Sequence, residues 1–439
     1  MTSSTSISSL FAWEALDSRG NPTVACEVTL ADGSTGAAMS PSGASTGTYE
    51  ALELRDGGDR FDGKGTRKAV ANVNDHLARA VLGLDALDQP GIDRALRAAD
   101  GTAGLHRLGA NAVLSVSIAT AIAAAASRRM PLYRYVAESG STPLLPMPMV
   151  NIISGGAHAG RSIDIQDLLA VPVGAQRFSD AIELAWRVRR GTVLEADNRG
   201  LNTALIADEG GLGPVLPSNR AALELLDAGI RRAGLMPGED IAIAIDVAAN
   251  QFYDPATGRY RFGVEARDLD PTTLIDEVAQ WCRDFPIVSI EDVLADQDWD
   301  SWISAAQRLA DIQLLGDDLF VTDSARLTRG IEDRVANAVL VKPNQTGTLS
   351  DAHSVVNQAR DAGFATVLSA RSGETEDSWL ADLAVGWRTG QIKVGSTMRS
   401  ERTAKWNRLL RIEAELGGAA EFAGRSAVAS LSTSPAGTP

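Results

Sequence analysis

Residues 241–246 read IAIAID, a short apolar run that ends in a charged residue, and this pattern recurs five more times along the chain. The later runs are FPIVSIED (285–292), IQLLGDD (312–318), AVLVKPNQ (338–345), ATVLSARSG (365–373) and GQIKVG (390–395). The polar positions Glu291, Asp317, Lys342, Arg371 and Lys393 are 26, 25, 29 and 22 residues apart. Each interval fits one strand, one helix and two short loops, so the pattern predicts an α/β protein with a parallel β/α barrel.

The region before these repeats has a different pattern. Two predicted strands, 22–30 and 34–38, flank a turn, and three helical stretches follow at about 65–82, 91–99 and 109–128. The proline-rich segment SGSTPLLPMP (139–148) then indicates a boundary. We therefore expect an N-terminal α+β domain over 1–142 with a mobile loop at 40–50, a barrel over 143–424, and a disordered tail over 425–439.

Composition and charge narrow the class of protein. The 439 residues are 44% hydrophobic and 22% charged, which is typical of a globular protein. A net charge of −15 disfavours nucleic acid and anionic membranes as main partners. The longest apolar candidate, 118–126, is shorter than the roughly 18 residues of a membrane span. The first ten residues lack the pattern of a signal peptide, so we expect a cytoplasmic protein.

The ends of the predicted strands carry the residues that suggest chemistry. Active sites of β/α barrels lie at the carboxyl ends of the strands, where Asp246, Glu291 and Asp317 are expected to converge. Three carboxylates suit a hard divalent cation such as Mg²⁺. The alternative is that each one caps a helix or pairs with a lysine.

Two lysines are expected opposite these carboxylates, at the ends of later strands. Neighbouring cations would lower the pKa of Lys342 or Lys393, so that one of them could act as a base. A metal beside a substrate carboxylate would stabilise an ene-diolate after proton removal. Chemistry at the carbon next to a carboxylate is the natural inference, with an anionic small molecule as the substrate.

Three loops add further candidates. Glu209, in ALIADEGGLGP (204–214), precedes two glycines and could serve as a general acid. His158 lies in the glycine-rich segment ISGGAHAG (153–160). The segment SPSGASTGTYE (40–50) is rich in small hydroxyl residues, as expected of a loop that closes over a phosphorylated ligand.

These segments together resemble the enolase family. ALDSRGNPTV, PSGASTG, YEALELRDG, GGAHAG, IADEGG, SIED, GDDLFVTD, KPNQTGTL, ARSGETED and QIKVGS occur in the family's order and spacing, from about residue 10 to 424. The resemblance implies the enolase fold, in which a small N-terminal domain precedes a barrel of the order ββαα(βα)6. It also implies a homodimer or higher homo-oligomer.

The resemblance further implies a role for each matching residue. Asp246, Glu291 and Asp317 resemble the ligands of a first Mg²⁺, and Ser45 resembles a ligand that joins a second Mg²⁺ to the substrate. Lys342 resembles the base that removes a proton from the substrate, Lys393 the residue that binds the substrate carboxylate, and Glu209 the general acid. Arg371 and Ser372 resemble the pair that binds the phosphate. His158 and Asp167 match further active-site positions.

Several positions inside these motifs depart from the family pattern. The usual SHRSGETED has Ala370 in place of its histidine, and the usual QEF has Asp167 in place of its glutamate. Both changes create room near the reacting end of the substrate and alter the polar groups that help hydroxide leave. Four further departures lie nearby, at Ser154, Ala207, Val293 and Pro343.

These departures predict a specialised enolase relative. The chain resembles carboxyphosphonoenolpyruvate synthase, an enolase-like enzyme of phosphinothricin-type phosphonate biosynthesis, which implies a phosphonoformate donor as a second substrate. An ordinary enolase that tolerates the substitutions is the main alternative. A non-catalytic relative is a third reading, disfavoured because Ser45, both lysines and all three metal carboxylates are present.

Overall fold

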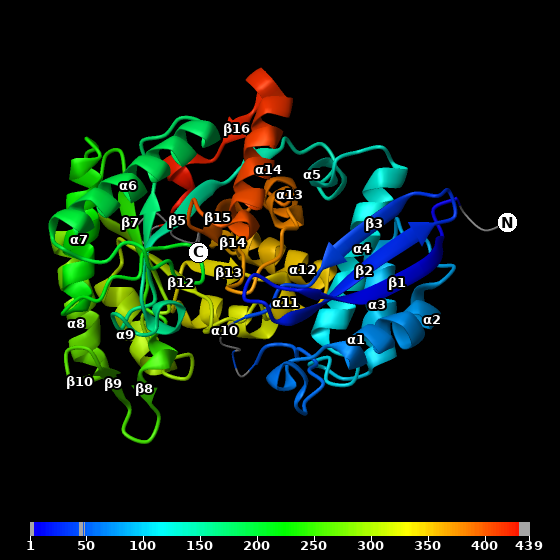
Figure 1. Ribbon diagram of the computed structural model, residues 1–439, viewed down its shortest axis with the longest axis horizontal. Coiled ribbons are helices and arrows are strands. Elements are labelled where there is room, and N and C mark those ends of the chain that lie inside the picture. The colour runs from blue at the N-terminus through cyan, green and yellow to red at the C-terminus, as the bar shows by residue number, and fades with distance from the viewer. Residues whose placement is uncertain (1–3, 44–46, 48, 430–439) are drawn as a thin grey trace, which may run out of the picture.

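The computed structural model describes residues 4–43, 47 and 49–429 (Figure 1). Ser45, the rest of 44–46, Thr48 and residues 430–439 lie outside this part of the chain. The predicted mobility of the loop at 40–50 and the role of Ser45 therefore stay predictions.

The N-terminal part is an antiparallel sheet covered by helices. Its strands lie in the order β1 (Ile7–Leu16), β2 (Pro22–Leu30) and β3 (Thr35–Met39), which confirms the two predicted strands. The helical elements are α1 (Arg67–Asn72), a π-helical turn (Val73–Leu77), α2 (Ala78–Val81), α3 (Gln89–Asp100), α4 (Ala110–Ser127) and α5 (Leu132–Tyr135). This sheet and its helices lie to one side of the barrel in Figure 1.

Helix α4 corrects the expectation that no segment is long and apolar enough to cross a membrane. It has 18 residues and a mean hydropathy of 1.6, and it is the single such helix in the described part of the chain. In the fold, 83% of it is buried, because it packs against β2 and β3 on one side and against neighbouring helices on the others. Its apolar surface thus forms the core of the N-terminal part.

The barrel has eight strands and closes in the order β11-β12-β13-β14-β15-β5-β6-β7. Strand β6 runs antiparallel to both of its neighbours, and the other pairings in the barrel are parallel. In chain order the strands are β5 (Met147–Ser154), β6 (Asp167–Val171), β7 (Ala242–Asp246), β11 (Ile287–Glu291), β12 (Gln313–Gly316), β13 (Ala338–Val341), β14 (Ala365–Ser369) and β15 (Gly390–Gly395).

Two helices follow the first two strands, and one main helix follows each later strand. They are α6 (Phe178–Asn198), α7 (Asn219–Arg232), α8 (Pro271–Asp284), α9 (Trp299–Arg308), α10 (Ser324–Asp333), α12 (Leu349–Asp361), α13 (Trp379–Gly386) and α14 (Ser400–Leu416). The order is ββαα(βα)6, as predicted. Smaller elements are β8 (Tyr253–Asp254), β9 (Arg259–Phe262), β10 (Arg267–Leu269), α11 (Pro343–Thr346), β4 (Leu144–Leu145) and β16 (Glu421–Phe422).

The start of the predicted disordered tail is ordered in the structure. Residues 424–427 form a 3₁₀ turn at the amino-terminal end of the barrel. The Ala427 carbonyl accepts a hydrogen bond from Gln391, and the Ala429 N–H donates to Gln313, over 2.9 Å in each case. Residues 425–429 therefore differ from the expectation, because side chains inside the barrel bind their backbone.

Candidate active site

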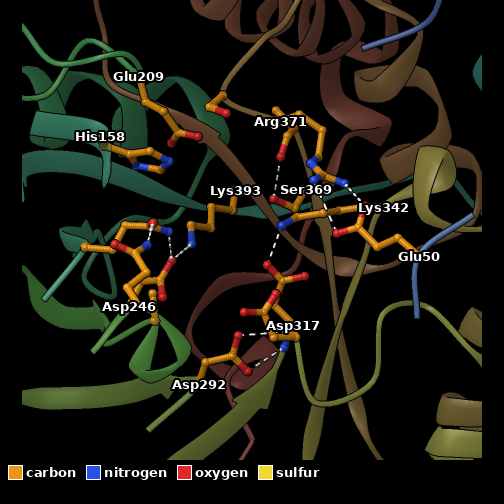
Figure 2. Close-up of a pocket in the computed structure, with 16 residues that line it drawn as sticks. Glu50, His158, Glu209, Asp246, Asp292, Asp317, Lys342, Ser369, Arg371 and Lys393 are labelled. Atoms are coloured by element: carbon orange, nitrogen blue, oxygen red, sulfur yellow. Dashed lines mark hydrogen bonds and ion pairs between the residues drawn. The ribbon is translucent and has the colours of Figure 1, made fainter. Parts of the chain in front are cut away.

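A cavity opens at the carboxyl ends of the barrel strands (Figure 2). Asp246 ends β7, Glu291 ends β11, and Asp317 and Lys342 follow β12 and β13 directly. The cavity is lined by Glu50, His158, Gln166, Glu209, Asp246, Ala248, Gln251, Asp292, Asp317, Asp318, Lys342, Ser369, Ala370, Arg371, Ser372 and Lys393. Most residues that the sequence singled out thus lie around one space.

The reversed strand β6 explains how Asp167 joins this group. Because β6 is antiparallel to β7, its first residue lies at the mouth where β7 ends, and Asp167 pairs with Asp246 in the strand register. Side chains that are far apart in the sequence are therefore brought to one rim of the barrel.

The carboxylates of Asp246 and Glu291 both form an ion pair with the ammonium group of Lys393. Lys393 Nζ lies 2.7 Å from Asp246 Oδ2 and 2.7 Å from Glu291 Oε2. The second oxygens, Asp246 Oδ1 and Glu291 Oε1, are buried and have no hydrogen-bond partner among the described residues. Buried carboxylate oxygens without partners are costly unless a cation binds them, so these residues fit a divalent metal ion.

The electrostatics of the cluster point in the same direction. Burial, and then the neighbouring Asp246 carboxylate, raise the pKa of Glu291 well above its usual range. Oxygens of Glu291, Asp292 and Asp317 also lie within 4.8 Å of one another. A bound Mg²⁺ would relieve this crowding of negative charge, and Asp246, Glu291 and Asp317 are the residues that would hold it.

The two lysines differ from the expectation in position and in pKa. Lys342 Nζ contacts Asp317 directly, and Lys393 contacts Asp246 and Glu291, so both lie beside the carboxylates rather than opposite them. Burial acts to lower the pKa of each lysine, but the adjacent carboxylates outweigh it and raise the pKa of both. The predicted downward shift of the lysine pKa values is therefore wrong.

Asp292 and Asp318 line the cavity but were not among the predicted site residues. Asp292 accepts hydrogen bonds from the backbone N–H groups of Asp317 and Asp318, over 3.0 and 2.8 Å. It thereby fixes the loop that carries Asp317. Burial, and then Asp317, raise the pKa of Asp318 to about 7, while Asn250 donates to its carboxylate. The sequence did carry a signal for them, because Asp292 and Asp318 each directly follow a predicted metal ligand at the end of a strand.

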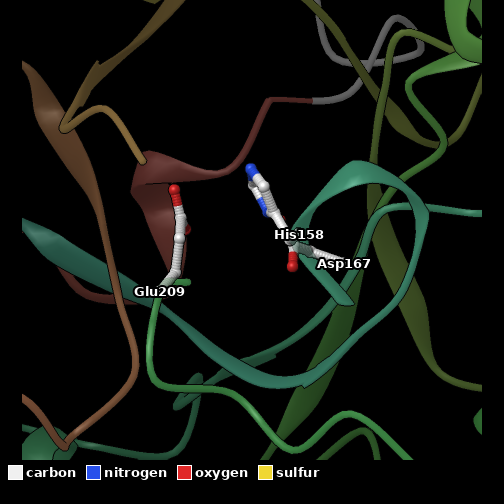
Figure 3. A group of neighbouring side chains, drawn as sticks. All are labelled: His158, Asp167 and Glu209. Atoms are coloured by element: carbon white, nitrogen blue, oxygen red, sulfur yellow. The ribbon is translucent and has the colours of Figure 1, made fainter. Parts of the chain in front are cut away.

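A second cluster consists of His158, Asp167 and Glu209 (Figure 3). A ring nitrogen of the histidine and one carboxylate oxygen of each acid lie within 4.8 Å of one another. Nδ1 of His158 lies 3.0 Å from Oδ2 of the fully buried Asp167. Burial acts to lower the pKa of His158, but Asp167 and then Glu209 raise it to about 9.

Glu209 is held as an anion in this arrangement. Burial acts to raise its pKa, but His158 and Arg402 outweigh burial and lower it. This direction differs from what a general acid needs, so the predicted acid role requires a change of charge when substrate binds.

Arg371 and Ser372 follow β14 and line the same cavity. Nη1 of Arg371 lies 2.9 Å from Oε2 of Glu50 and 3.1 Å from Oδ1 of Asn344. Glu50 comes from the N-terminal part of the chain and was missed by the sequence reasoning, although it ends the segment predicted to cover the site. The carbonyl of Ser372 accepts from the buried Arg402, which fixes this loop.

One departure from the family pattern lines this cavity, and others adjoin site residues. Ala370 is 6% exposed, lines the cavity and donates its N–H to the Lys393 carbonyl over 2.8 Å. Ser154 donates its hydroxyl to Asp167 over 2.9 Å. A shorter carboxylate at 167 is therefore held by a hydroxyl at 154. Pro343 begins α11 directly after Lys342, whose N–H donates to Thr322.

Comparison with protein families agrees with this geometry over almost the whole chain. Residues 7–136 match the family model of the enolase N-terminal domain, and residues 142–431 match that of the enolase C-terminal TIM barrel domain. The chain belongs to the enolase family. As an enolase-family protein it is an enolase-type enzyme, and the family's usual Mg²⁺ agrees with the carboxylate clusters described above.

Proposed function

We propose that this enolase-family enzyme acts on a phosphorylated three-carbon acid of the 2-phosphoglycerate or phosphoenolpyruvate type, and that it is specialised as a carboxyphosphonoenolpyruvate synthase. The product of such an enzyme is a phosphoenolpyruvate-like compound with a carboxyphosphono group on the enol oxygen. Free or activated phosphonoformate is the donor class. The substitutions at 370 and 167 carry this specialisation.

The chain's own residues divide the work at the reacting carbon. Asp246, Glu291 and Asp317 would hold Mg²⁺, which supplies positive charge that stabilises the charge developing on the substrate carboxylate. Lys342 is the proposed base for the proton next to that carboxylate. Lys393, fixed between two carboxylates, is the proposed ligand of the substrate carboxylate.

Two further groups orient the substrate. Arg371 presents a buried guanidinium, the side chain best suited to hold a phosphoryl group through paired hydrogen bonds, and Ser372 follows it. His158 and Glu209 line the same cavity, Asp167 lies beside His158, and we place the leaving group or the incoming donor next to them. A second Mg²⁺ with Ser45 as a ligand is proposed from the family resemblance.

Ala370 and Asp167 support a changed reaction. An alanine leaves space that the family's histidine would fill, and Asp167 withdraws a carboxylate by one methylene, about 1.5 Å. Ser154 donates to the shortened side chain, so the polar network is rebuilt around it. A wider pocket would have room for the additional carboxylate of a carboxyphosphono group. The altered acidic groups would be less suited to helping hydroxide leave.

Ordinary enolase activity is the second candidate. The observation in its favour is that Asp246, Asp317 and Glu209 line one cavity together with both lysines of the predicted catalytic set. A dehydration that needs only these groups would proceed despite the changes at 167 and 370.

The deciding assay follows phosphoenolpyruvate formation from 2-phosphoglycerate with Mg²⁺, beside product formation with phosphonoformate donors. We expect slow or absent dehydration and turnover with a donor. Fast dehydration without use of any donor would overturn the specialisation and favour an ordinary enolase. The double variant Ala370→His with Asp167→Glu should raise dehydration at least about tenfold and lower donor use.

A further inference from the structure

We propose that Glu50 competes with the substrate's phosphoryl group for Arg371 and thereby selects which anions the site accepts. This inference deepens the proposed function, on which it rests for the identity of Arg371 as the anion-binding group. It assigns a specificity-determining role to a carboxylate from the N-terminal part of the chain.

The contact between Glu50 and Arg371 is close, paired and buried (Figure 2). Nη1 of Arg371 lies 2.9 Å from Oε2 of Glu50, and Nη2 lies 3.3 Å from Oε1. The side chains are 5% and 6% exposed. Glu50 therefore presents two oxygens to the guanidinium, as a phosphoryl group would.

Glu50 is held in this position by further donors. The Gly47 N–H donates to its Oε1 over 2.9 Å, and Gln345 Nε2 lies 3.4 Å from the same oxygen. Gln345 Nε2 also donates to Oδ1 of Asp317, over 3.0 Å. The carboxylate of Glu50 is thus linked through one amide to a carboxylate of the proposed metal site.

The neighbouring residue anchors this segment on the barrel. The Tyr49 ring centroid lies 4.1 Å from Cζ of Arg326, at cation–π distance. Arg326 is itself fixed, because its guanidinium donates to the carbonyls of Leu319 and Asp296 over 2.7 and 3.1 Å. Glu50 therefore faces Arg371 from a segment that is bound to the loops after β11 and β12.

Competition follows from charge. An anion that approaches Arg371 while Glu50 remains in place meets a buried carboxylate of like charge, and this repulsion is strong where water is excluded. A phosphoryl dianion offers more charge than Glu50 and can displace it. A carboxylate monoanion offers no more than Glu50 already does. Discrimination in favour of phosphoryl groups is the expected result.

The opposite reading makes Glu50 a positioning residue that holds Arg371 ready for the substrate. The two readings predict opposite signs. Removing the charge at residue 50 strengthens anion binding if Glu50 competes, and weakens it if Glu50 positions the guanidinium.

The test is calorimetric titration of the full-length protein, with Mg²⁺ present, using inorganic phosphate and, separately, acetate. The variant is Glu50→Gln, which keeps the shape and removes the charge. Glu138→Gln is the matched control, because Glu138 lies at the surface and pairs with Arg360 instead. We expect about tenfold tighter phosphate binding for Glu50→Gln, a larger gain for acetate, and no change for the control.

Two further variants close the design. The gain in phosphate affinity should disappear when Arg371→Gln is added to Glu50→Gln. Glu50→Ala, which removes the hydrogen-bonding groups as well as the charge, should show the same gain. Weaker or unchanged phosphate binding in folded Glu50→Gln and Glu50→Ala proteins would overturn the proposal. Since this readout needs no turnover, failure of both enzymatic assays would remove the proposed function and leave the competition by Glu50 intact.

Discussion

The imidazole of His158 and the carboxylate of Asp167 form a buried pair, with Nδ1 of one 3.0 Å from Oδ2 of the other. Asp167 also accepts from Asn151 and Ser154, so its position is fixed from three sides. The pair holds a positive charge on the imidazole, because the pKa of His158 rises to about 9 despite its burial.

Asp167→Asn should lower the pKa of His158 towards 6.5 or below, because the charge that stabilises the imidazolium is removed while burial remains. The pKa is measured by NMR titration of the metal-free protein, with exposed His76 as an internal reference. A His158 pKa that stays near 9 in the variant would show that Asp167 does not hold the charge.

The same pair makes stability depend on pH. A folded pKa of about 9, above the unfolded value of 6.5, stabilises the protein fully below about pH 6.5, and this contribution is lost as pH rises through about 9. Urea unfolding in EDTA at pH 6 and pH 9.5 should therefore show a smaller difference for Asp167→Asn than for the unchanged protein. Equal differences in the two proteins would contradict the expectation.

Lys342→Ala should reduce turnover by about 10²–10⁴-fold with any accepted substrate, because it removes the proposed base. Mg²⁺ binding should survive, since Lys342 contacts Asp317 but contributes no metal ligand. Rates and calorimetric Mg²⁺ binding are measured together, with Lys68→Ala, on an exposed lysine away from the cavity, as the control. Retained turnover would remove Lys342 from this role.

Removal of Mg²⁺ should destabilise the protein. At a concentration 100 times its dissociation constant, a ligand that binds only the folded state stabilises it by about 2.7 kcal/mol. Glu291→Gln should lose most of this gain, because it removes a charge from the proposed ligand set. Thermal unfolding with Mg²⁺ and with EDTA measures the effect, and Glu138→Gln at the surface serves as the control. An equal Mg²⁺ gain in both variants would exclude Glu291 as a ligand.

Gly36→Ala should destabilise the N-terminal part by about 1–3 kcal/mol, the usual range for overpacking. A Cβ at residue 36 would lie 2.3 Å from the Ala119 carbonyl oxygen and 2.3 Å from the Ala123 nitrogen, both in the backbone of α4. Urea unfolding checks this, with Gly418→Ala as the control, because a Cβ there meets no atom within 4 Å. Equal effects of the two changes would rule out close packing of β3 on α4.

The fold could be predicted from the sequence because its signals are local and repeated. The apolar runs that end at Asp246 and Glu291 predicted strands of a barrel, and both residues end strands at its mouth. The family motifs implied the order ββαα, and the structure adds that β6 runs in the reverse direction and brings Asp167 to the same rim.

The sequence could not predict which charges touch. Lys342 and Lys393 were expected to lie among cations, yet each contacts carboxylates, because strand register rather than sequence distance sets their neighbours. Glu50 was missed for a similar reason, since 321 residues separate it from Arg371 and no local pattern links them. The roles assigned to all of the candidate site residues, among them Ser45, Glu209 and Ser372, stay predictions.

Helix α4 has a consequence for the order in which the chain becomes folded during synthesis. During synthesis β1, β2 and β3 leave the ribosome before Ala110–Ser127 does. The sheet that covers this apolar helix is therefore already outside the tunnel when the helix emerges. Domains generally fold as units from the N-terminus onwards. The sheet is therefore available to cover this apolar helix as it emerges, before the first barrel strand, Met147–Ser154, leaves the tunnel.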